Sequence, residues 1–190
     1  MKRFLVAGLG NPEGQYFGTW HNLGFVAAEK LASILGACFS IKGNALTAAA
    51  SNVIVVKPLT YMNRSGEAVV HLKRKKKIAS ERILIFVDDV YIEKGKIKII
   101  RGGTSGHNGT RSIRDHLGSE EYIRIKIGCK PAREMADISG YVLSRVPEAE
   151  RELIDEALNK AVTAVQLFLS GETLEAVQMK FNSNARGEGV

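Results

Sequence analysis

The chain has 190 residues, of which 45% are hydrophobic, and this size and composition are typical of one soluble globular domain. Its 27 lysine and arginine residues outnumber 20 aspartate and glutamate residues, and the net charge of +7 favours a polyanionic partner, either a nucleic acid or an anionic membrane surface. No apolar run approaches the roughly 20 residues of a membrane-spanning helix. Two cysteines are too few for a disulfide framework and suggest a reducing compartment, so we expect a cytoplasmic protein.

Strand-like and helix-like segments alternate along the chain. RFLVAGL (3–9) is a short apolar run ended by glycine and proline, which predicts a buried strand. Apolar residues at helical spacing predict a helix from Asn22 to Leu35, and a β-rich stretch follows, with its clearest strand over 52–58. The remaining pattern predicts, in order, a helix over 66–77, strands over 82–89 and 95–101, a helix over 109–117, a strand over 122–128, and helices over 148–169 and 173–181.

This order predicts one α/β domain, residues 1–182, with a twisted mixed sheet flanked by helices and a long C-terminal helix. The segment 82–89 is almost uniformly apolar, as in a buried strand, whereas 95–101 and 122–128 alternate polar and apolar residues, which argues against an all-parallel sheet. The polar tail, 183–190, is expected to be disordered.

The sequence lacks the motifs that several common types of enzyme and binding site require. GLGNPEG follows a strand but has the wrong glycine spacing for a dinucleotide loop, and no phosphate-binding GKS or GKT is present. No serine lies in a G-x-S-x-G elbow. The histidines form no H-x-x-x-H pair and no cysteine lies near another, so we expect neither a metal ion nor a cofactor.

Polar residues gather instead where strands are predicted to end, which is where α/β proteins bind their ligands. Those candidates are Asn11, His21, Asn63, Asp88 and the pair His107-Asn108. A histidine can take a proton from water, a carboxylate can orient the ring, and amides can hold water or donate to an oxyanion. Taken singly, Asn11 could be a turn residue, Asn63 a helix cap and His21 a core histidine, but together they favour water-mediated hydrolysis.

Three motifs occur in order along the chain. They are GLGNPEGQY followed by WHN, KPLTYMNRSG, and a DD pair leading through KIKIIRGG to GHNGTRSI. Over about residues 3–180, the chain resembles bacterial-type peptidyl-tRNA hydrolases. The resemblance implies hydrolysis of the ester between a peptide and the terminal ribose of tRNA, by a monomeric single-domain α/β protein without a metal or a required protein partner.

The resemblance also implies roles for individual residues. His21 matches the catalytic histidine, Asp88 its carboxylate partner and Asn11 the amide near the attacked carbonyl. The substrate-binding positions are matched by Tyr16, Met62, Asn63, His107 and Asn108, of which Asn108 is expected to help hold the water. We interpret Asn22 as a helix cap, and expect Asp89 to point to the opposite side from Asp88.

The chain departs from the family pattern at three places. Tyr91 stands where a second acid is usual, and the glycine loop before His107 is one residue short. Of the two basic residues that grip the tRNA 5′ phosphate in the family, the arginine is matched by Lys126, and the lysine position falls near Ile100, with Arg101 or Lys98 as substitutes. We predict that Arg101 and Lys126 form the clamp, because their strands are expected to end on the catalytic side.

Two other functions are alternatives to hydrolysis of peptidyl-tRNA. A non-catalytic RNA-binding module of the same fold would use the positive charge without needing His21 or Asp88. A hydrolase of small esters or amides would need no excess of positive charge. The basic run KRKKK (73–77) could supply RNA contacts, although basic residues at the end of a helix also complement the helix dipole.

Overall fold

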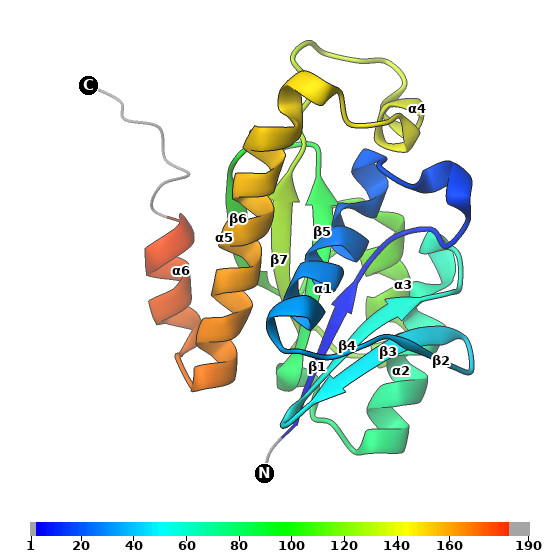
Figure 1. Cartoon of the computed structure of the whole chain (residues 1–190), viewed down its shortest axis with the longest axis vertical. Coiled ribbons are helices and arrows are strands. Elements are labelled where there is room, and N and C mark those ends of the chain that lie inside the picture. The colour runs from blue at the N-terminus through cyan, green and yellow to red at the C-terminus, as the bar shows by residue number, and fades with distance from the viewer. Residues whose placement is uncertain (1–2, 183–190) are drawn as a thin grey trace.

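The first apolar run forms β1 (Phe4–Gly8), which lies in the middle of a mixed sheet (Figure 1). The computed structural model describes residues 3–182, and in them the sheet has seven strands in the order β2-β3-β4-β1-β5-β7-β6. β1 pairs in parallel with β4 (Val53–Pro58) on one side and with β5 (Ile83–Asp89) on the other. Both neighbours are buried along their whole length, as their apolar sequences predict.

The outer strands make the sheet mixed. β7 (Ile123–Gly128) runs parallel to β5, so β4, β1, β5 and β7 all have their carboxyl ends at one edge, which we call the carboxyl edge. β6 (Ile97–Arg101) is antiparallel to β7, and on the far side β3 (Ala45–Ala50) is antiparallel to β4 and to β2 (Ser40–Lys42). The prediction of a mixed sheet is confirmed.

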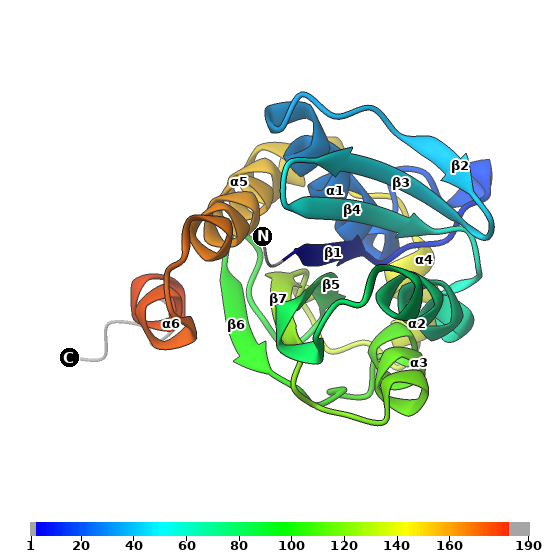
Figure 2. The same ribbon diagram turned by 90° about the horizontal axis from the view of Figure 1, so that it is seen from below.

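Helices cover both faces of the sheet (Figure 2). α1 (Leu23–Ile34) and the long α5 (Arg151–Ser170) lie on one face, and α2 (Ser65–Lys76) and α3 (Asn108–Leu117) lie on the other. Because side chains alternate along a strand, each face contributes to its own apolar cluster. Phe86 of β5 belongs to the cluster under α1 and α5, and Val87 to the one under α2 and α3.

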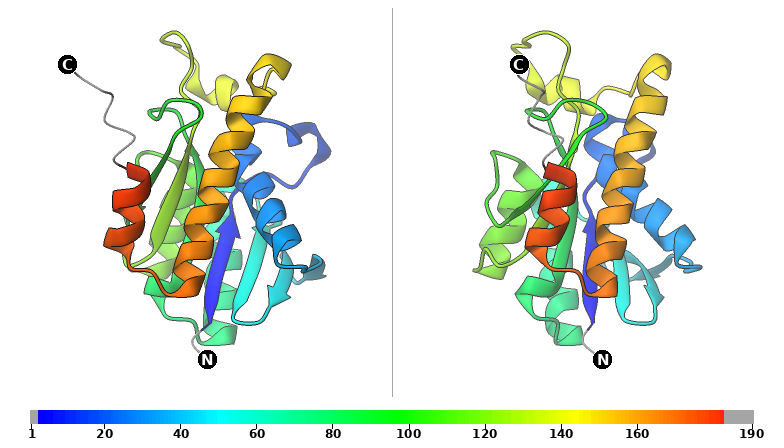
Figure 3. Two further views of the ribbon diagram at one scale, coloured as in Figure 1. Left: turned by 60° about the vertical axis from the view of Figure 1, so that its left-hand side comes forward. Right: turned by 90° about the vertical axis from the view of Figure 1, so that its left-hand side faces the viewer.

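The last helix, α6 (Leu174–Asn182), lies beside the edge strand β6 (Figure 3). The side-chain amide of Asn182 accepts a hydrogen bond from the Ile99 N–H at 2.8 Å and donates one to the Ile99 carbonyl at 2.8 Å. Gln178 donates to the same carbonyl at 3.0 Å. These bonds pair backbone groups that an uncovered edge strand would expose to association with another chain.

Two glycines allow α1 to begin against the end of β1. A Cβ atom added to Gly8 would lie 2.1 Å from the Gly24 carbonyl oxygen, and one added to Gly24 would lie 2.5 Å from the Leu9 backbone nitrogen. The 3-10 turn Trp20–Asn22, which precedes α1, is therefore held next to the carboxyl end of β1. This contact brings His21 to the carboxyl edge.

One α-helix was not predicted. α4 (Ile138–Leu143) lies in the segment between β7 and α5 and sits above the carboxyl edge (Figure 1). Its residues are exposed or half-buried, and six residues are too few to establish a helical period. The predicted tail, 183–190, lies outside the described residues.

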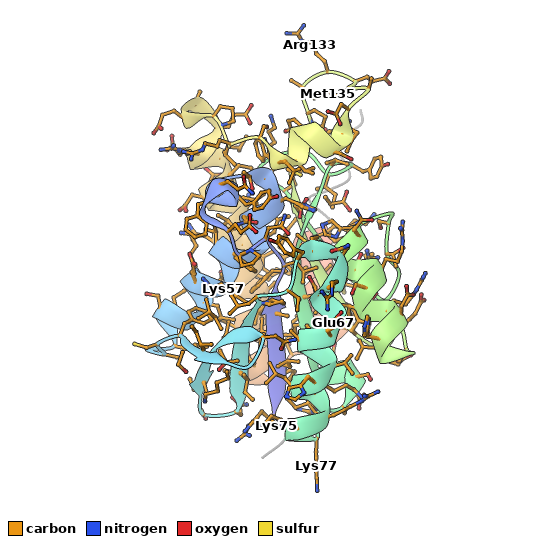
Figure 4. The ribbon with its side chains drawn as sticks, turned by 90° about the vertical axis from the view of Figure 1, so that its right-hand side faces the viewer. Lys57, Glu67, Lys75, Lys77, Arg133 and Met135 are labelled. Carbon is orange, nitrogen blue, oxygen red and sulfur yellow. The ribbon has the colours of Figure 1, made fainter. Side chains whose placement is uncertain are left out.

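Within the described part of the chain, no helix combines the length and apolarity needed to cross a membrane. The basic run 73–77 ends α2, and Lys75 and Lys77 lie at the opposite end of the molecule from Arg133 and Met135, which follow β7 (Figure 4). The run is thus far from the carboxyl edge.

Candidate active site

A cleft of about 620 Å³ opens at the carboxyl edge. Apolar side chains of α4, including Ile138 and Val142, form part of its wall. Most of the predicted site residues line this cleft, namely Asn11, His21, Met62, Asn63, Asp88, His107 and Asn108. The structure therefore brings together residues that are scattered over about half of the sequence.

Asp88, at the end of β5, joins the two histidines of the cleft. Its Oδ2 lies 2.9 Å from His21 Nδ1 and its Oδ1 lies 3.0 Å from His107 Nε2. Asp88 is 3% exposed, and this burial alone would raise the pKa of its carboxyl group. The positive charges that His107 and His21 carry when protonated, and the hydrogen bonds of both rings, outweigh burial and hold the pKa well below its usual range, so Asp88 is a carboxylate that only accepts hydrogen bonds.

The hydrogen bonds of His107 define its tautomer. His107 is the N-cap of α3, and its Nδ1 accepts a hydrogen bond from the Gly109 backbone N–H at 3.1 Å. A neutral imidazole that accepts at Nδ1 carries its proton on Nε2. Nε2–H of His107 therefore donates to Asp88, and this bond fixes the carboxylate from the side opposite His21.

The tautomer of His21 follows from the same reasoning. Because Asp88 can only accept, Nδ1 of His21 donates to it, and Nε2 keeps a free lone pair. The rings of His21 and His107 lie 4.9 Å apart between centroids. His21 thus has the form of a general base, with its second nitrogen oriented by a carboxylate.

Asn11 is held by its backbone and by its side chain. Its Oδ1 accepts from the Met62 backbone N–H at 2.9 Å, which leaves its Nδ2 donor available. The Asn22 amide bonds both backbone groups of Asn11, accepting from N–H at 2.8 Å and donating to the carbonyl at 3.0 Å. Asn22 occupies the N-cap position of α1, as predicted, but its side chain makes no cap bond and positions the Asn11 loop instead.

The residues predicted to bind substrate are placed differently from one another. Asn63 and Asn108 are exposed in the cleft at the N-terminal ends of α2 and α3, and Met62 is buried between them and the core. Tyr16 is half-buried and does not line the cleft, whereas Tyr61, which we did not single out, does. Tyr61 stands next to the Met62-Asn63 pair in KPLTYMNRSG, so that motif contained the signal.

The prediction that Arg101 lies at the carboxyl edge is wrong. β6 is antiparallel to β7, and Arg101 pairs with Ile123, at the start of β7, while Asp88 pairs with Ile127 near its end. Arg101 therefore lies toward the opposite edge, where its guanidinium forms a salt bridge with Glu121 at 2.8 Å. Alternating polarity could not give the direction of this strand.

Lys126 lies on the correct strand end but is not free. Its ammonium forms an ion pair with Asp89 and donates to Ser105 Oγ at 3.2 Å, and the residue is 7% exposed. Asp89 does face away from the histidines, as alternation predicts, but toward a buried cation and not toward solvent. Ser105 and Arg124, which also bonds Ser105, were not anticipated.

His21, Asp88 and His107 each offer one potential metal-ligand atom, and these three atoms lie within 4.8 Å of one another, a spacing that a metal ion could in principle bridge. The Gly109 N–H bond to His107 argues against a metal ligand role, because a ring that accepts at Nδ1 has its Nε2 protonated and cannot coordinate through it. His21, Asp88 and His107 are instead joined by hydrogen bonds, with both rings donating to the carboxylate.

A sequence model of peptidyl-tRNA hydrolase matches residues 5–188. The chain belongs to the peptidyl-tRNA hydrolase family. Among curated relatives, the peptidyl-tRNA hydrolase of Pelodictyon phaeoclathratiforme is 42% identical over 161 residues, covering 81% of this chain and 85% of the relative. That of Thermoanaerobacter sp. (strain X514) is 39% identical over 186 residues, covering 94% of this chain and 99% of the relative.

The fold agrees with this membership. A crystal structure of peptidyl-tRNA hydrolase from Acinetobacter baumannii superposes with a TM-score of 0.87 at 34% identity, covering 94% of this chain and 93% of that chain. The resemblance to the peptidyl-tRNA hydrolase family inferred from the three motifs is confirmed.

Proposed function

We propose that this chain hydrolyses the ester bond between a peptide and the terminal ribose of tRNA, with His21 as the general base. The observation that carries the proposal is the hydrogen-bonded chain His21–Asp88–His107 in a cleft that also holds amide side chains. The relatives named as peptidyl-tRNA hydrolases support the choice of substrate. The net charge of +7 suits a partner that carries many phosphates.

The first step is activation of water. Nε2 of His21 takes a proton from a water molecule, and the oxygen of that water forms a bond to the ester carbonyl carbon. Asp88 stabilises the imidazolium that results, because its carboxylate accepts the bond from Nδ1–H at 2.9 Å. We assign Asn108, which is exposed in the cleft at the start of α3, as the residue that holds the attacking water.

The second step is collapse of the tetrahedral intermediate. The attack has converted the carbonyl oxygen into an oxyanion, and we assign Nδ2 of Asn11 as its donor, since Oδ1 of that amide is committed to the Met62 N–H; in the collapse the C=O bond re-forms. The bond to the ribose oxygen then breaks, and His21 returns its proton to that oxygen. The products are a peptide with a free carboxyl group and tRNA with a free terminal hydroxyl.

Other residues bind the substrate in this proposal. Met62 and Asn63 contact the substrate near the ester, and Tyr16 contacts it outside the cleft, at the turn that precedes His21. Arg101 is an RNA phosphate contact remote from the ester, because its side chain is 43% exposed and a surface salt bridge such as that with Glu121 is easily exchanged. We also propose a monomer in the cytoplasm, since every group of the mechanism lies on one chain and both cysteines are free thiols.

One assay tests the proposal against its alternatives. The protein is incubated with N-blocked aminoacyl-tRNA, with free aminoacyl-tRNA and with a small aliphatic ester, and the released tRNA or acid is measured. We expect cleavage of the N-blocked aminoacyl-tRNA. Binding of tRNA without cleavage would instead support an RNA-binding module, and cleavage of the small ester alone would support a general esterase.

A further inference from the structure

The loop over 102–107 must carry the chain from one edge of the sheet to the other. β6 ends where Arg101 pairs with the first residue of β7, whereas His107 bonds Asp88, whose β7 partner is Ile127. This is a span of about 13 Å along β7, at about 3.3 Å per residue. Left-handed backbone occurs at Gly102, Gly103, Ser105 and Gly106, so the loop has many alternative conformations from which one must be selected.

Side chains from one face of β7 hold the first part of the loop. Tyr122, just before the strand, donates from its hydroxyl to the Gly103 carbonyl at 2.7 Å. Arg124, two residues on, donates from Nε to the Gly102 carbonyl at 2.6 Å. Both residues are buried, and the bond from Arg124 to Gly102 is shielded from water.

Two buried cations meet at the hydroxyl of Ser105. Its Oγ lies 3.3 Å from Arg124 Nη1 and 3.2 Å from Lys126 Nζ. Asp89 forms an ion pair with the same ammonium and thereby fixes its position. Ser105 has φ of 48°, a left-handed conformation that a residue with a side chain adopts only when its surroundings hold it. It stands two residues before His107.

We propose that the chain Asp89–Lys126–Ser105, together with Arg124, is a positioning device that sets His107 against Asp88. The inference rests on the proposed hydrolytic roles of His21 and Asp88. Lys126 then acts on the chemical step through the loop, and is not the phosphate ligand that its place in the family motif implies. A buried ammonium already paired with Asp89 and bonded to Ser105 is poorly suited to grip a phosphate of the substrate.

The two roles of Lys126 predict opposite kinetics. A loop anchor that orients His107 affects kcat, because misplacement of reacting groups by about 1 Å can cost about 10²-fold, whereas a phosphate contact affects KM and the salt dependence of binding. Lys126→Met removes the charge and keeps the length. Lys130→Met makes the same change at an exposed residue just past β7 and serves as the matched control.

Ser105 gives a second test that does not leave a buried charge without its ion pair. Ser105→Ala removes the hydroxyl and keeps the left-handed strain, whereas Ser105→Asn keeps an oxygen acceptor on a residue that tolerates this conformation. We expect kcat to fall about 10-fold or more in Ser105→Ala and Lys126→Met, with KM and the salt slope unchanged. Ser105→Asn recovers part of that rate, and Lys130→Met retains the wild-type rate.

A measurement independent of activity accompanies the kinetics. The ¹⁵N chemical shifts of the histidine rings distinguish a nitrogen that carries a proton from one that does not, so they report whether His107 keeps its Nε2–H form. We expect the His107 signals to change in Ser105→Ala and to stay as in the wild type in Lys130→Met. If Lys126→Met does not fold, the double variant Asp89→Asn/Lys126→Met removes both charges of the pair and takes its place.

The inference is overturned if His107 signals and kcat are unchanged in Ser105→Ala. It is also overturned if Lys126→Met raises KM and flattens the salt dependence while kcat stays the same, since Lys126 would then be a phosphate ligand. A wild-type protein that fails to cleave N-blocked aminoacyl-tRNA contradicts the proposed function instead. The histidine signals would still decide whether Ser105 positions His107.

Discussion

Replacement of Asp88 by asparagine is expected to disable His21 through its tautomer. The amide has one accepting oxygen and one donating nitrogen, but in the native site both histidines donate to this residue. If the oxygen faces His107, the nitrogen faces His21 Nδ1. That ring must then accept at Nδ1 and carry its proton on Nε2, where it cannot remove a proton from water.

The opposite orientation of the amide is less stable. It would force a proton onto Nδ1 of His107, which now accepts from the Gly109 N–H, and the loss of this N-cap bond costs about 0.5–2 kcal/mol. A difference of about 0.5–2 kcal/mol corresponds to about a 2- to 30-fold excess of the inactive arrangement. The hydrogen bond between the carboxylate and the imidazolium contributes about 1.5–3 kcal/mol, as is usual for a bond to a charged group, so its loss adds about 10- to 100-fold. We therefore expect kcat to fall by about 10² to 10³.

The assay is single-turnover release of tRNA from N-blocked aminoacyl-tRNA, with thermal unfolding to check that the variant is folded. Asp115→Asn makes the same charge change at an exposed residue of α3 and is expected to be silent. A variant of Asp88 that keeps its rate within about fivefold would refute the tautomer argument, as would an Nδ1–H signal for His21 in its ¹⁵N spectrum.

Three further predictions follow from the site. His21→Ala is expected to lower kcat by about 10²- to 10⁴-fold because it removes the general base, and to cost about 1–3 kcal/mol of unfolding free energy because Asp88 loses one of its two histidine partners; a rate near that of the wild type would remove His21 from the mechanism. Asn22→Ala leaves the backbone groups of Asn11 without their side-chain partners, so it is expected to cost about 1–3 kcal/mol of unfolding free energy in urea and to lower kcat. Asn22→Asp keeps the oxygen that accepts from the Asn11 N–H and is the milder control. Equal stability of all three proteins would contradict the assigned contact. The folded pKa of Asp88 is below its unfolded value of about 4, so its ionisation stabilises the protein above that pH and this contribution is lost as the pH falls toward the folded pKa. Urea unfolding at about pH 5 and about pH 3, both below the ordinary pKa of histidine, should therefore show a smaller stability gap between wild type and Asp88→Asn at the lower pH, and a constant gap would contradict the lowered pKa.

Local patterns in the sequence determined most of the secondary structure. The apolar runs before Asn11 and up to Asp88 became β1 and β5, because a segment that is apolar on both faces is stable only inside a sheet covered on both sides. Helical periodicity located α1 and α5 to within a few residues at each end. The motifs also identified His21, Asp88 and His107 as candidates before any contact among them was known.

Contacts across long stretches of sequence were decided by the tertiary structure alone. His21 and Asp88 are 67 positions apart in sequence, and no local pattern specifies that Asp88 accepts from two histidines at once. The direction of β6 placed Arg101 at the far edge, and alternation of polar and apolar residues is the same for a parallel and an antiparallel strand. The sequence alone indicates that Lys126 is a free cation at a strand end. Only the packing of β7 under the glycine loop pairs it with Asp89 and Ser105, because burial of a charge requires partners that the whole fold must supply.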